Sequence, residues 1–261
     1  RSLDDGKTWK NMGLKNSEHI GIIEIDPNNS NKIYVAAYGP LWKEGGERGL
    51  YFSEDGGKEW KLILQTNKHT GINEVHIDPN SPETIYATAH QRRRHVFTYV
   101  GGGEGSKIYK SSDAGKNWKE LKNGLPSAIK GRIGMDISPA NTDYLYALIE
   151  AENDQQGLYF SKNKGESWEK VNKYVTSGNY YQEVFCDPLD HNKVFFMDTW
   201  LHHTEDGGKT IVKTGEKSKH VDNHCIWIDP KDTDHWIVGC DGGIYETWDH
   251  ASNWHYKPNL P

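Results

Sequence analysis

One eight-residue pattern, Ser/Thr-x-Asp-x-Gly-x-x-Trp, recurs along the chain and restricts its fold more than any other feature. Three copies are intact and three carry one substitution, and successive copies begin 51, 58, 50, 43 and 43 residues apart. The copies begin at Ser2, Ser53, Ser111, Ser161, Thr204 and Thr247. A period of this length is typical of repeat proteins, in which one supersecondary unit is copied along the chain.

A second pattern keeps the same period. Apolar alternation runs into Asp-Pro at Ile23–Pro27, Val75–Pro79 and Ile226–Pro230, and a β-branched or aromatic run follows each time. Alternation with a period of two, bounded by Pro, Gly and Asn, is typical of strands, and no segment shows helical periodicity. Each unit therefore holds four short strands, A to D. Four antiparallel strands repeated in this way are the blades of a β-propeller, so we predict an all-β fold.

We predict a single propeller region over residues 1–261, with about five complete blades plus a partial one. The complete blades are expected at 19–64, 72–123, 131–172, 180–215 and 221–258. Residues 1–13 resemble the turn and outer strand of a preceding blade, so we expect a larger propeller in a longer parent polypeptide. An isolated piece would leave apolar blade faces exposed, which is an aggregation hazard.

The turn pattern itself predicts a structural role. Its Asp can accept hydrogen bonds from turn amides, its Gly permits a left-handed backbone, and its Trp can pack beneath the turn. The triplet Asp4-Asp5-Gly6 is not a calcium loop, because the later Glu and the ligand spacing are absent.

Charge and composition exclude two classes of partner. The chain has 31 Lys and Arg against 37 Asp and Glu, and its longest basic run is Arg92–Arg94, which argues against a nucleic-acid partner. No stretch approaches the roughly 18 consecutive apolar residues of a membrane span.

Cys225 and Cys240 flank a predicted hairpin turn. They could form a disulfide, although two reduced, buried thiols are the favoured interpretation.

The repeats resemble the Asp boxes, or bacterial neuraminidase repeats, of sialidases, xyloglucanases and the sortilin-type receptor propeller. The whole chain, including Ala37–Trp42, Gln91–Arg94, Gly131–Gly134 and Asp241–Gly243, is similar to large secreted bacterial proteins. Those proteins are named glycosyl hydrolases or sortilin-like repeat proteins. The resemblance implies a secreted, periplasmic or cell-surface bacterial protein with a propeller of seven or more blades.

Loop variation predicts which face carries function. The A–B loops and the C–D turns are uniform, whereas the B–C loops differ: Tyr38–Gly49, His90–Gly105 and Glu150–Gly157 are long, and Asp241–Gly243 is tight. Loops with a structural role should be alike in every blade, whereas loops that contact a single ligand should differ from blade to blade. In an up-and-down blade the B–C and D–A loops share one face, so we expect the ligand there.

The candidate ligand-binding residues on that face are aromatic, basic or imidazole side chains. They are Trp42, Arg92, Arg93, Arg94, His95, Arg132, Tyr180, Tyr181, His202, His203, His220 and His224. Rings that stack on sugar faces, beside polar groups that read hydroxyls, suit an extracellular glycan. Arg92–Arg94 could bind an anion or could pair with local carboxylates.

Alternating residues His220, Asp222 and His224 would share one face of a strand and suit a metal or a proton relay. However, carboxylate-oriented histidine pairs are common structural supports. We therefore predict no metal and no cofactor, and His220, Asp222 and His224 are only the nearest metal candidates.

The leading hypothesis is a propeller that binds an extracellular polymer, a glycan, on the variable face. Glycoside hydrolysis is the first alternative, with Glu183, Asp222 and Asp241 as catalytic candidates, although these carboxylates could equally form salt bridges or hydrogen bonds. No local motif specifies catalysis. Arg93, Arg132, Tyr181 and Glu183 are the nearest match to a sialidase site, and the Arg-Ile-Pro element of sialidases is absent. The sortilin resemblance implies a further alternative, a platform that binds peptides or proteins.

Overall fold

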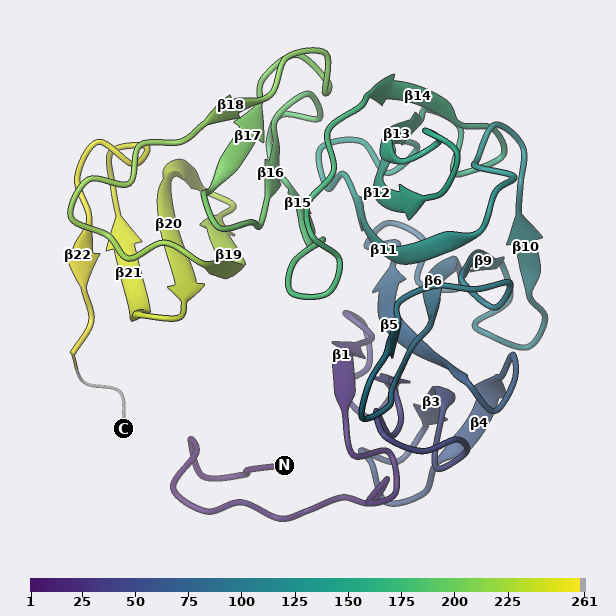
Figure 1. Ribbon diagram of the computed structural model, residues 1–261. Coiled ribbons are helices and arrows are strands. Elements are labelled where there is room, and N and C mark those ends of the chain that lie inside the picture. Colours follow the sequence, from purple (N-terminus) through teal and green to yellow (C-terminus); the bar gives the residue numbers. More distant parts are fainter. Residues whose placement is uncertain (259–261) are drawn as a thin grey trace. The chain divides into compact units, whose positions relative to one another are not determined.

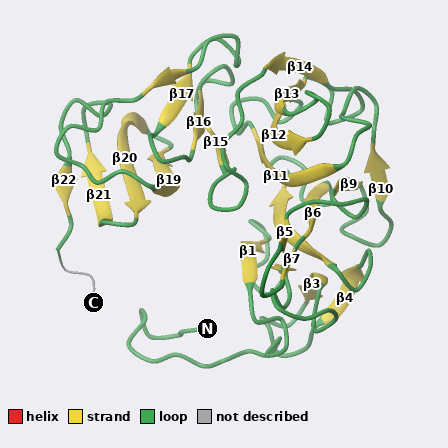
Figure 2. Cartoon of the chain, in the orientation of Figure 1, coloured by secondary structure: helices red, strands yellow, loops and turns green. Residues whose placement is uncertain are grey.

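The computed structural model describes residues 1–258, and every regular element in that range is a β-strand (Figures 1 and 2). The strands form five four-stranded antiparallel sheets and one small hairpin. The predicted all-β fold of propeller blades is therefore confirmed. The chain divides into two compact units, one from Arg1 to Glu120 and one that begins at Leu121.

Unit 1 contains two blades. The first pairs its strands in chain order: β1 (Ile20–Ile25), β2 (Ile33–Ala37), β3 (Gly49–Ser53) and β4 (Lys61–Leu64). The second consists of β5 (Thr70–Ile77), β6 (Ile85–Gln91), β9 (Lys107–Ser111) and β10 (Lys119–Leu121). Its B–C connection carries the hairpin β7 (Arg93–Arg94) and β8 (Tyr99–Val100). Buried Tyr34, Leu50, Ile72 and Ile85 belong to one core between the two blades.

Unit 2 contains three blades in the same order. The third blade is β11 (Lys130–Ile137), β12 (Leu145–Ala151), β13 (Gly157–Ser161) and β14 (Glu169–Asn172). The fourth is β15 (Val184–Cys186), β16 (Val194–Phe196), β17 (His202–Thr204) and β18 (Val212–Lys213). The fifth is β19 (Asn223–Asp229), β20 (Asp232–Cys240), β21 (Gly243–Thr247) and β22 (His255–Tyr256).

Glycines let the first strand of one blade approach the backbone of the next. A Cβ on Gly21 would lie 2.1 Å from the carbonyl oxygen of Asn73, and a Cβ on Gly134 would lie 1.6 Å from that of Gln182. Real Cβ atoms do not approach that closely, and a backbone carbonyl cannot rotate away as a side chain can. Neighbouring blades therefore pack backbone against backbone at these two points.

The six recurring turns share the hydrogen bonds that the pattern predicts. In the third turn the Ser111 hydroxyl donates to Asp113 at 2.8 Å and accepts from the amide of Gly115 at 2.9 Å. The Asp113 carboxylate also accepts from the Asn117 backbone amide and side chain, and these bonds lower its pKa to about 2. Gly115 has φ +85°, which is the left-handed region that favours glycine.

The tryptophans of the turns bond in two ways. The indoles of Trp9, Trp118 and Trp168 donate to the carbonyl of the glycine in their own turn. Those of Trp60 and Trp254 instead donate to the carbonyls of Met12 and Gly215, in the segment before the blade. These last two rings therefore tie the turn of a blade to its incoming chain, a contact that the sequence pattern does not reveal.

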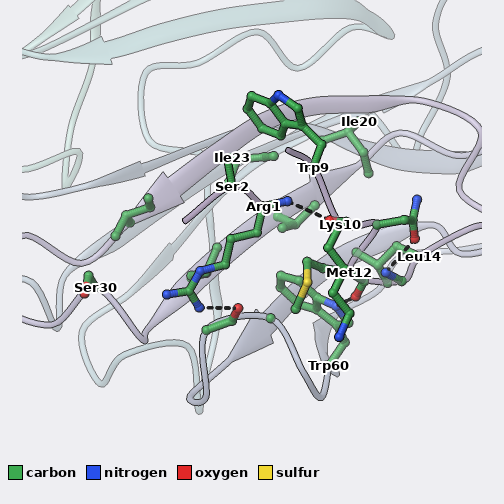
Figure 3. A pocket seen from close by; sticks show the side chains of 17 residues that line it. Arg1, Ser2, Trp9, Lys10, Met12, Leu14, Ile20, Ile23, Ser30 and Trp60 are labelled. Carbon is green, nitrogen blue, oxygen red and sulfur yellow. Dashed lines mark hydrogen bonds between the residues drawn. The ribbon is translucent and has the colours of Figure 1, made fainter. Parts of the chain in front are cut away.

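The outer face of β1 is apolar and open. Ile20, Ile23 and Ile25 are 40%, 59% and 52% exposed. Residues 1–14 run beside this strand without forming a strand of their own, and Arg1 and Lys10 exchange two backbone hydrogen bonds (Figure 3). Together with β1 they line a groove of about 550 Å³. The expected apolar exposure is thus present, and the assignment of residues 1–13 to a preceding blade stays a prediction.

Candidate functional site

Within unit 2, the B–C and D–A connections meet through backbone hydrogen bonds. The amides of Asp222, at the end of the D–A connection, and Asn223, the first residue of β19, donate to the carbonyls of Thr199 and Asp198 in the B–C loop of the fourth blade. The amide of Asp241, in the B–C turn of the fifth blade, donates to the carbonyl of Asp222 at 3.1 Å. Residues far apart in sequence are held together here by their main chains, which is a rigid base for a site.

Tyr181 and Asp222 form the centre of this region. The Tyr181 hydroxyl donates to the Asp222 carboxylate at 2.6 Å. It also accepts from the Thr199 hydroxyl at 3.4 Å. Burial, together with the hydrogen bond to Asp222, raises the pKa of Tyr181, so the phenol stays a donor at neutral pH. Asp222 has φ +63°, an uncommon backbone conformation for a residue with a side chain.

Rings extend the site beyond this pair. The ring of Tyr181 stacks on that of His224 at a centroid distance of 5.5 Å and lies 6.2 Å from that of Tyr180. Nε2 of His224 lies 2.8 Å from the Asp241 carboxylate. Tyr180 is 63% exposed, so its ring is open to solvent. We call Tyr180, Tyr181, Asp222, His224 and Asp241 the Tyr181 cluster.

Glu183 has a different environment from the other two catalytic candidates. Its carboxylate forms an ion pair and a hydrogen bond with the Arg132 guanidinium, whose Nη1 also donates to the Tyr181 carbonyl at 3.0 Å. A guanidinium stabilises the ionised carboxylate, so this contact argues against Glu183 as a proton donor. Arg132 and Glu183 instead support the backbone at Tyr181.

Two supporting acids carry no sequence signal. Glu150 accepts the amides of Gly178 and Arg132, both at 3.1 Å. Glu216 accepts the Leu201 amide, the Asn223 side-chain amide and the ammonium of Lys219. The side chains of Lys219 and Glu216 are 0% and 3% exposed, which makes this a buried ion pair beneath the D–A connection.

The other histidine candidates of unit 2 are separate from the Tyr181 cluster or at its margin. β19 begins at Asn223, so His220 and Asp222 precede the strand, and the expected alternation of His220, Asp222 and His224 on one strand face is wrong. Nδ1 of His220 lies 2.7 Å from the Val221 carbonyl. His202 contacts the Tyr174 hydroxyl, and His203 contacts the hydroxyl of Thr214, the residue that follows β18.

The candidates of unit 1 make mostly local contacts. The Arg92 guanidinium lies 3.4 Å from the ring centroid of Tyr38, and that of Arg94 lies 5.1 Å from that of Tyr99. Arg93 lies 3.7 Å from the Glu44 carboxylate, which also binds Lys68, and these cations lower the pKa of Glu44. Arg93 thus pairs with a local carboxylate, whereas Arg92 and Arg94 stack on tyrosine rings, and anion binding by Arg92–Arg94 stays a prediction.

Two unit 1 candidates are exposed, and the cysteines are free thiols. Trp42 and His95 face solvent.

Cys225 pairs in the ladder with Gly239, and Cys240 pairs with Asn223. Neither cysteine is in a disulfide; Cys225 is exposed and Cys240 is half-buried, so the expectation of two buried thiols is wrong.

Comparison with known proteins gives sequence relatives of two kinds. Sortilin from Rattus norvegicus is 35% identical over 188 residues, which cover 66% of this chain and 20% of that protein. A probable oligoxyloglucan-reducing end-specific xyloglucanase from Neosartorya fischeri is 23% identical over 291 residues, covering 95% of this chain and 34% of that protein. The chain thus spans about a fifth to a third of the length of these relatives. They come from a mammal and a fungus, so the expected bacterial source stays a prediction.

Solved structures support the fold. An ancestral GH74 enzyme superposes with a TM-score of 0.67 and 17% identity, over 97% of this chain and 34% of the other. YCF48 bound to D1 peptide superposes with a TM-score of 0.58 and 12% identity, over 93% and 67%. In residues 1–258 no helix is long and apolar enough to cross a membrane.

A family model described as Sortilin-Vps10 (sortilin, neurotensin receptor 3) matches residues 48–203. The match covers more than half of the 261 residues and runs from the first blade into the fourth. The chain belongs to the Sortilin-Vps10 family.

Proposed function

We propose that this chain is part of an extracellular propeller protein that binds a glycan polymer at the Tyr181 cluster. The observation that carries the proposal is the open ring of Tyr180 beside the stacked pair Tyr181–His224, with the Asp222 and Asp241 carboxylates at its edge. Rings supply apolar faces for sugar rings, and the carboxylates supply acceptors for hydroxyl groups. Similarity to xyloglucanases over nearly the whole chain supports a plant-type polysaccharide as the first probe.

Binding is tested with soluble xyloglucan by affinity electrophoresis and calorimetry. Tyr180→Ala removes the exposed ring and is expected to weaken binding about tenfold, a change of about 1.4 kcal/mol. Tyr181→Phe keeps the stacked ring and removes only the hydroxyl that donates to Asp222. It should weaken binding less than Tyr181→Ala does.

The control is Tyr256→Ala, because Tyr256 is a similarly exposed tyrosine on the outer strand β22. Its substitution should leave the affinity unchanged. Equal affinity of wild type, Tyr180→Ala and Tyr181→Ala would contradict the proposal, and so would failure of the wild type to bind xyloglucan and a panel of other plant, fungal and bacterial glycans.

Glycoside hydrolysis is a second candidate function, favoured by the same relatives and by two carboxylates of the cluster. Asp222 accepts from Tyr181, and Asp241 contacts His224, so both are held in place. A hydrolase should release reducing ends from xyloglucan oligosaccharides and should lose this activity in Asp222→Asn and Asp241→Asn. If the chain binds xyloglucan but releases no reducing ends, glycoside hydrolysis is contradicted and glycan binding alone remains.

Family membership raises peptide binding as a further candidate, and the similarity to a structure described as bound to D1 peptide supports it. A peptide ligand would be captured from a random peptide library and would not compete with xyloglucan oligosaccharides. Capture of such a peptide, with no glycan bound, would replace the glycan proposal by the peptide one.

A further inference from the structure

Two turns of neighbouring blades in unit 2 bring two imidazoles and a carboxylate together. His203 is the middle residue of strand β17 and directly precedes Thr204, at which the turn of the fourth blade begins; Glu205 lies in that turn, and His250 lies in the turn of the fifth blade. Nε2 of His203 lies 4.0 Å from the Glu205 carboxylate, and Nε2 of His250 lies 3.7 Å from it. Each of the three residues offers one atom that could bind a metal, and these three atoms all lie within 4.8 Å of one another.

Both imidazoles are oriented by contacts at their other nitrogen. Nδ1 of His203 lies 2.8 Å from the Thr214 hydroxyl, and Nδ1 of His250 lies 3.3 Å from the Asp234 carboxylate. At His203, an Nδ1 proton donated to the Thr214 hydroxyl leaves the Nε2 lone pair available. At His250 the same tautomer requires Nδ1 to donate to Asp234 and not to accept from Lys193. This is the usual arrangement around histidines that bind a metal.

Packing fixes the two rings further. The His203 ring stacks on Phe195 at 5.9 Å, and the His250 ring meets Trp236 edge to face at 4.6 Å. Phe195 and Trp236 are both fully buried core residues. By contrast, the Glu205 side chain is 63% exposed and can move to close the distances.

Comparison among the repeats shows that these histidines are not part of the structural unit. The position before the turn holds Phe52, Lys110, Phe160 and Glu246 in the other complete blades, and only the fourth blade has a histidine there. The position of His250 holds Gly56, Ala114, Lys164 and Gly207. That position has a left-handed backbone, with φ 54° at His250, for which glycine is the least strained residue. A structural role would repeat, so a histidine here needs another reason.

The charges around the trio are compatible with a cation. Glu205 and Asp234 are acidic, and the ammonium of Lys193 lies 3.9 Å from the buried Asp187 carboxylate. Lys193 lies 3.1 Å from Nδ1 of His250 and competes with Asp234 for that nitrogen.

We propose that His203, Glu205 and His250 form a binding site for a divalent transition-metal ion of the zinc type, joining the fourth and fifth blades. Two imidazole nitrogens and one carboxylate oxygen suit Zn²⁺ and not Ca²⁺ or Mg²⁺, which take oxygen ligands. Zn²⁺ needs ligand distances of about 2.0–2.2 Å. The exposed Glu205 must therefore move toward the two rings, and a fourth position is left for water.

The site is tested by calorimetric titration of the folded chain with Zn²⁺ alone, with Ca²⁺ in parallel. The wild type should bind one Zn²⁺ at this site, and Ca²⁺ should not bind there. Glu205→Gln alters an exposed side chain, so it should fold normally and bind Zn²⁺ at least tenfold more weakly. Asp234→Asn acts through the orientation of His250 and should weaken binding about 10- to 100-fold. His250→Gln should abolish binding at this site.

The matched control is His69→Ala. His69 and Glu44 also form an imidazole–carboxylate pair at 3.7 Å, but they do not belong to a group of three ligands within 4.8 Å in residues 1–258. The Zn²⁺ affinity of the His69→Ala variant should equal that of the wild type.

Replacement of Zn²⁺ by Co²⁺ identifies the ligands by spectroscopy. Nitrogen and oxygen ligands should give a spectrum without thiolate-to-cobalt charge transfer, whereas such a band would assign the metal to Cys225 or Cys240. That band, absence of Zn²⁺ binding to the wild type, or unchanged affinity in Glu205→Gln and His250→Gln would each overturn the proposal.

Discussion

At the scale of single residues, the side chains that fix the candidate site are buried charges outside the repeat pattern. Glu216 collects three hydrogen bonds from Leu201, Lys219 and Asn223, and thereby joins a B–C loop to a D–A connection. Lys219 also donates to the His220 carbonyl and lies 5.3 Å from the ring centroid of Trp254. A buried pair of this kind is stable only while both charges are present.

Removal of one partner is expected to destabilise the chain. Lys219→Met leaves the Glu216 carboxylate buried without its cation and should lower the free energy of unfolding by about 3 kcal/mol, measured by urea denaturation. Lys61→Met is the control, since Lys61 and Glu54 form an exposed pair at 3.5 Å, and it should change the free energy of unfolding by less than about 0.5 kcal/mol. Equal effects of the two substitutions would show that the Lys219 pair contributes no more than a surface pair.

At the scale of the element, the sequence predicts the four-stranded unit and its turn well. The turn is local: an oxygen of residue i accepts the amide of residue i+4, as Ser111 and Asp113 show, and each of these bonds can be read from spacing alone. The hydrogen-bond partner of a tryptophan is less local. Trp60 bonds to Met12, 48 residues earlier in the chain, although its turn carries the same four pattern residues as that of Trp118, which bonds within its own turn.

The turn carboxylates are expected to make stability depend on acid pH. The pKa of Asp4 and of Asp113 is lowered from 3.8 to about 2 by hydrogen bonds from the turn, so folding favours the ionised form. Each therefore contributes stability that is complete above its unfolded pKa and is lost as the pH falls from about 4 toward 2. Asp113→Asn should reduce the slope of the free energy of unfolding against pH in that window, measured by urea denaturation at several pH values.

Asn163 occupies the same position in the fourth turn and accepts the Ser167 amide at 3.0 Å, so an amide is compatible with the turn. Asp5→Asn is the control, because it removes a carboxylate within a turn without replacing Asp4, the residue that accepts the amide of that turn. A slope that Asp113→Asn does not change more than Asp5→Asn does would contradict the role assigned to the turn carboxylate.

Close backbone approach between blades gives a prediction at the same scale. Gly134→Ala would place a Cβ 1.6 Å from the Gln182 carbonyl oxygen, and the Gly134 backbone cannot move away without disturbing its ladder with β12. We expect a loss of about 1–3 kcal/mol in the free energy of unfolding, measured by thermal or urea denaturation. Gly215→Ala, whose Cβ would meet only the Ala251 carbonyl at 3.4 Å, should have a much smaller effect. Similar losses for both would contradict the packing argument.

At the scale of the whole molecule, the feature with the clearest consequence is the open apolar face of β1 in unit 1. Three isoleucines with 40–59% exposure lie on one strand, and exposed apolar surface of this kind favours association. The residues that line the groove beside it, including Arg1, Trp9 and Met12, cover it only in part (Figure 3).

Ile23→Lys is therefore expected to reduce self-association of the chain. A charge on this face should lower the concentration-dependent increase in particle size that dynamic light scattering measures, with little loss of stability because Ile23 is 59% exposed. Leu189→Lys is the control, since Leu189 is 63% exposed and lies outside this face. Association that Ile23→Lys leaves unchanged would show that another surface drives it.

The sequence by itself determined the all-β fold, the four-strand unit and the chemistry of its turns, because these depend on short spacings that repeat. It also gave the side chains Tyr181, Asp222 and Asp241 as candidates, although not their partners. Only the tertiary structure decided that Tyr181 donates to Asp222, that Glu183 pairs with Arg132, and that Lys219 and Glu216 lie buried together. It also placed His250 beside His203, which lies 47 positions earlier in the chain. Apart from the Lys219–Glu216 pair, which lies within one D–A connection, these contacts join different blades. A contact that occurs once leaves no period in the sequence that could reveal it.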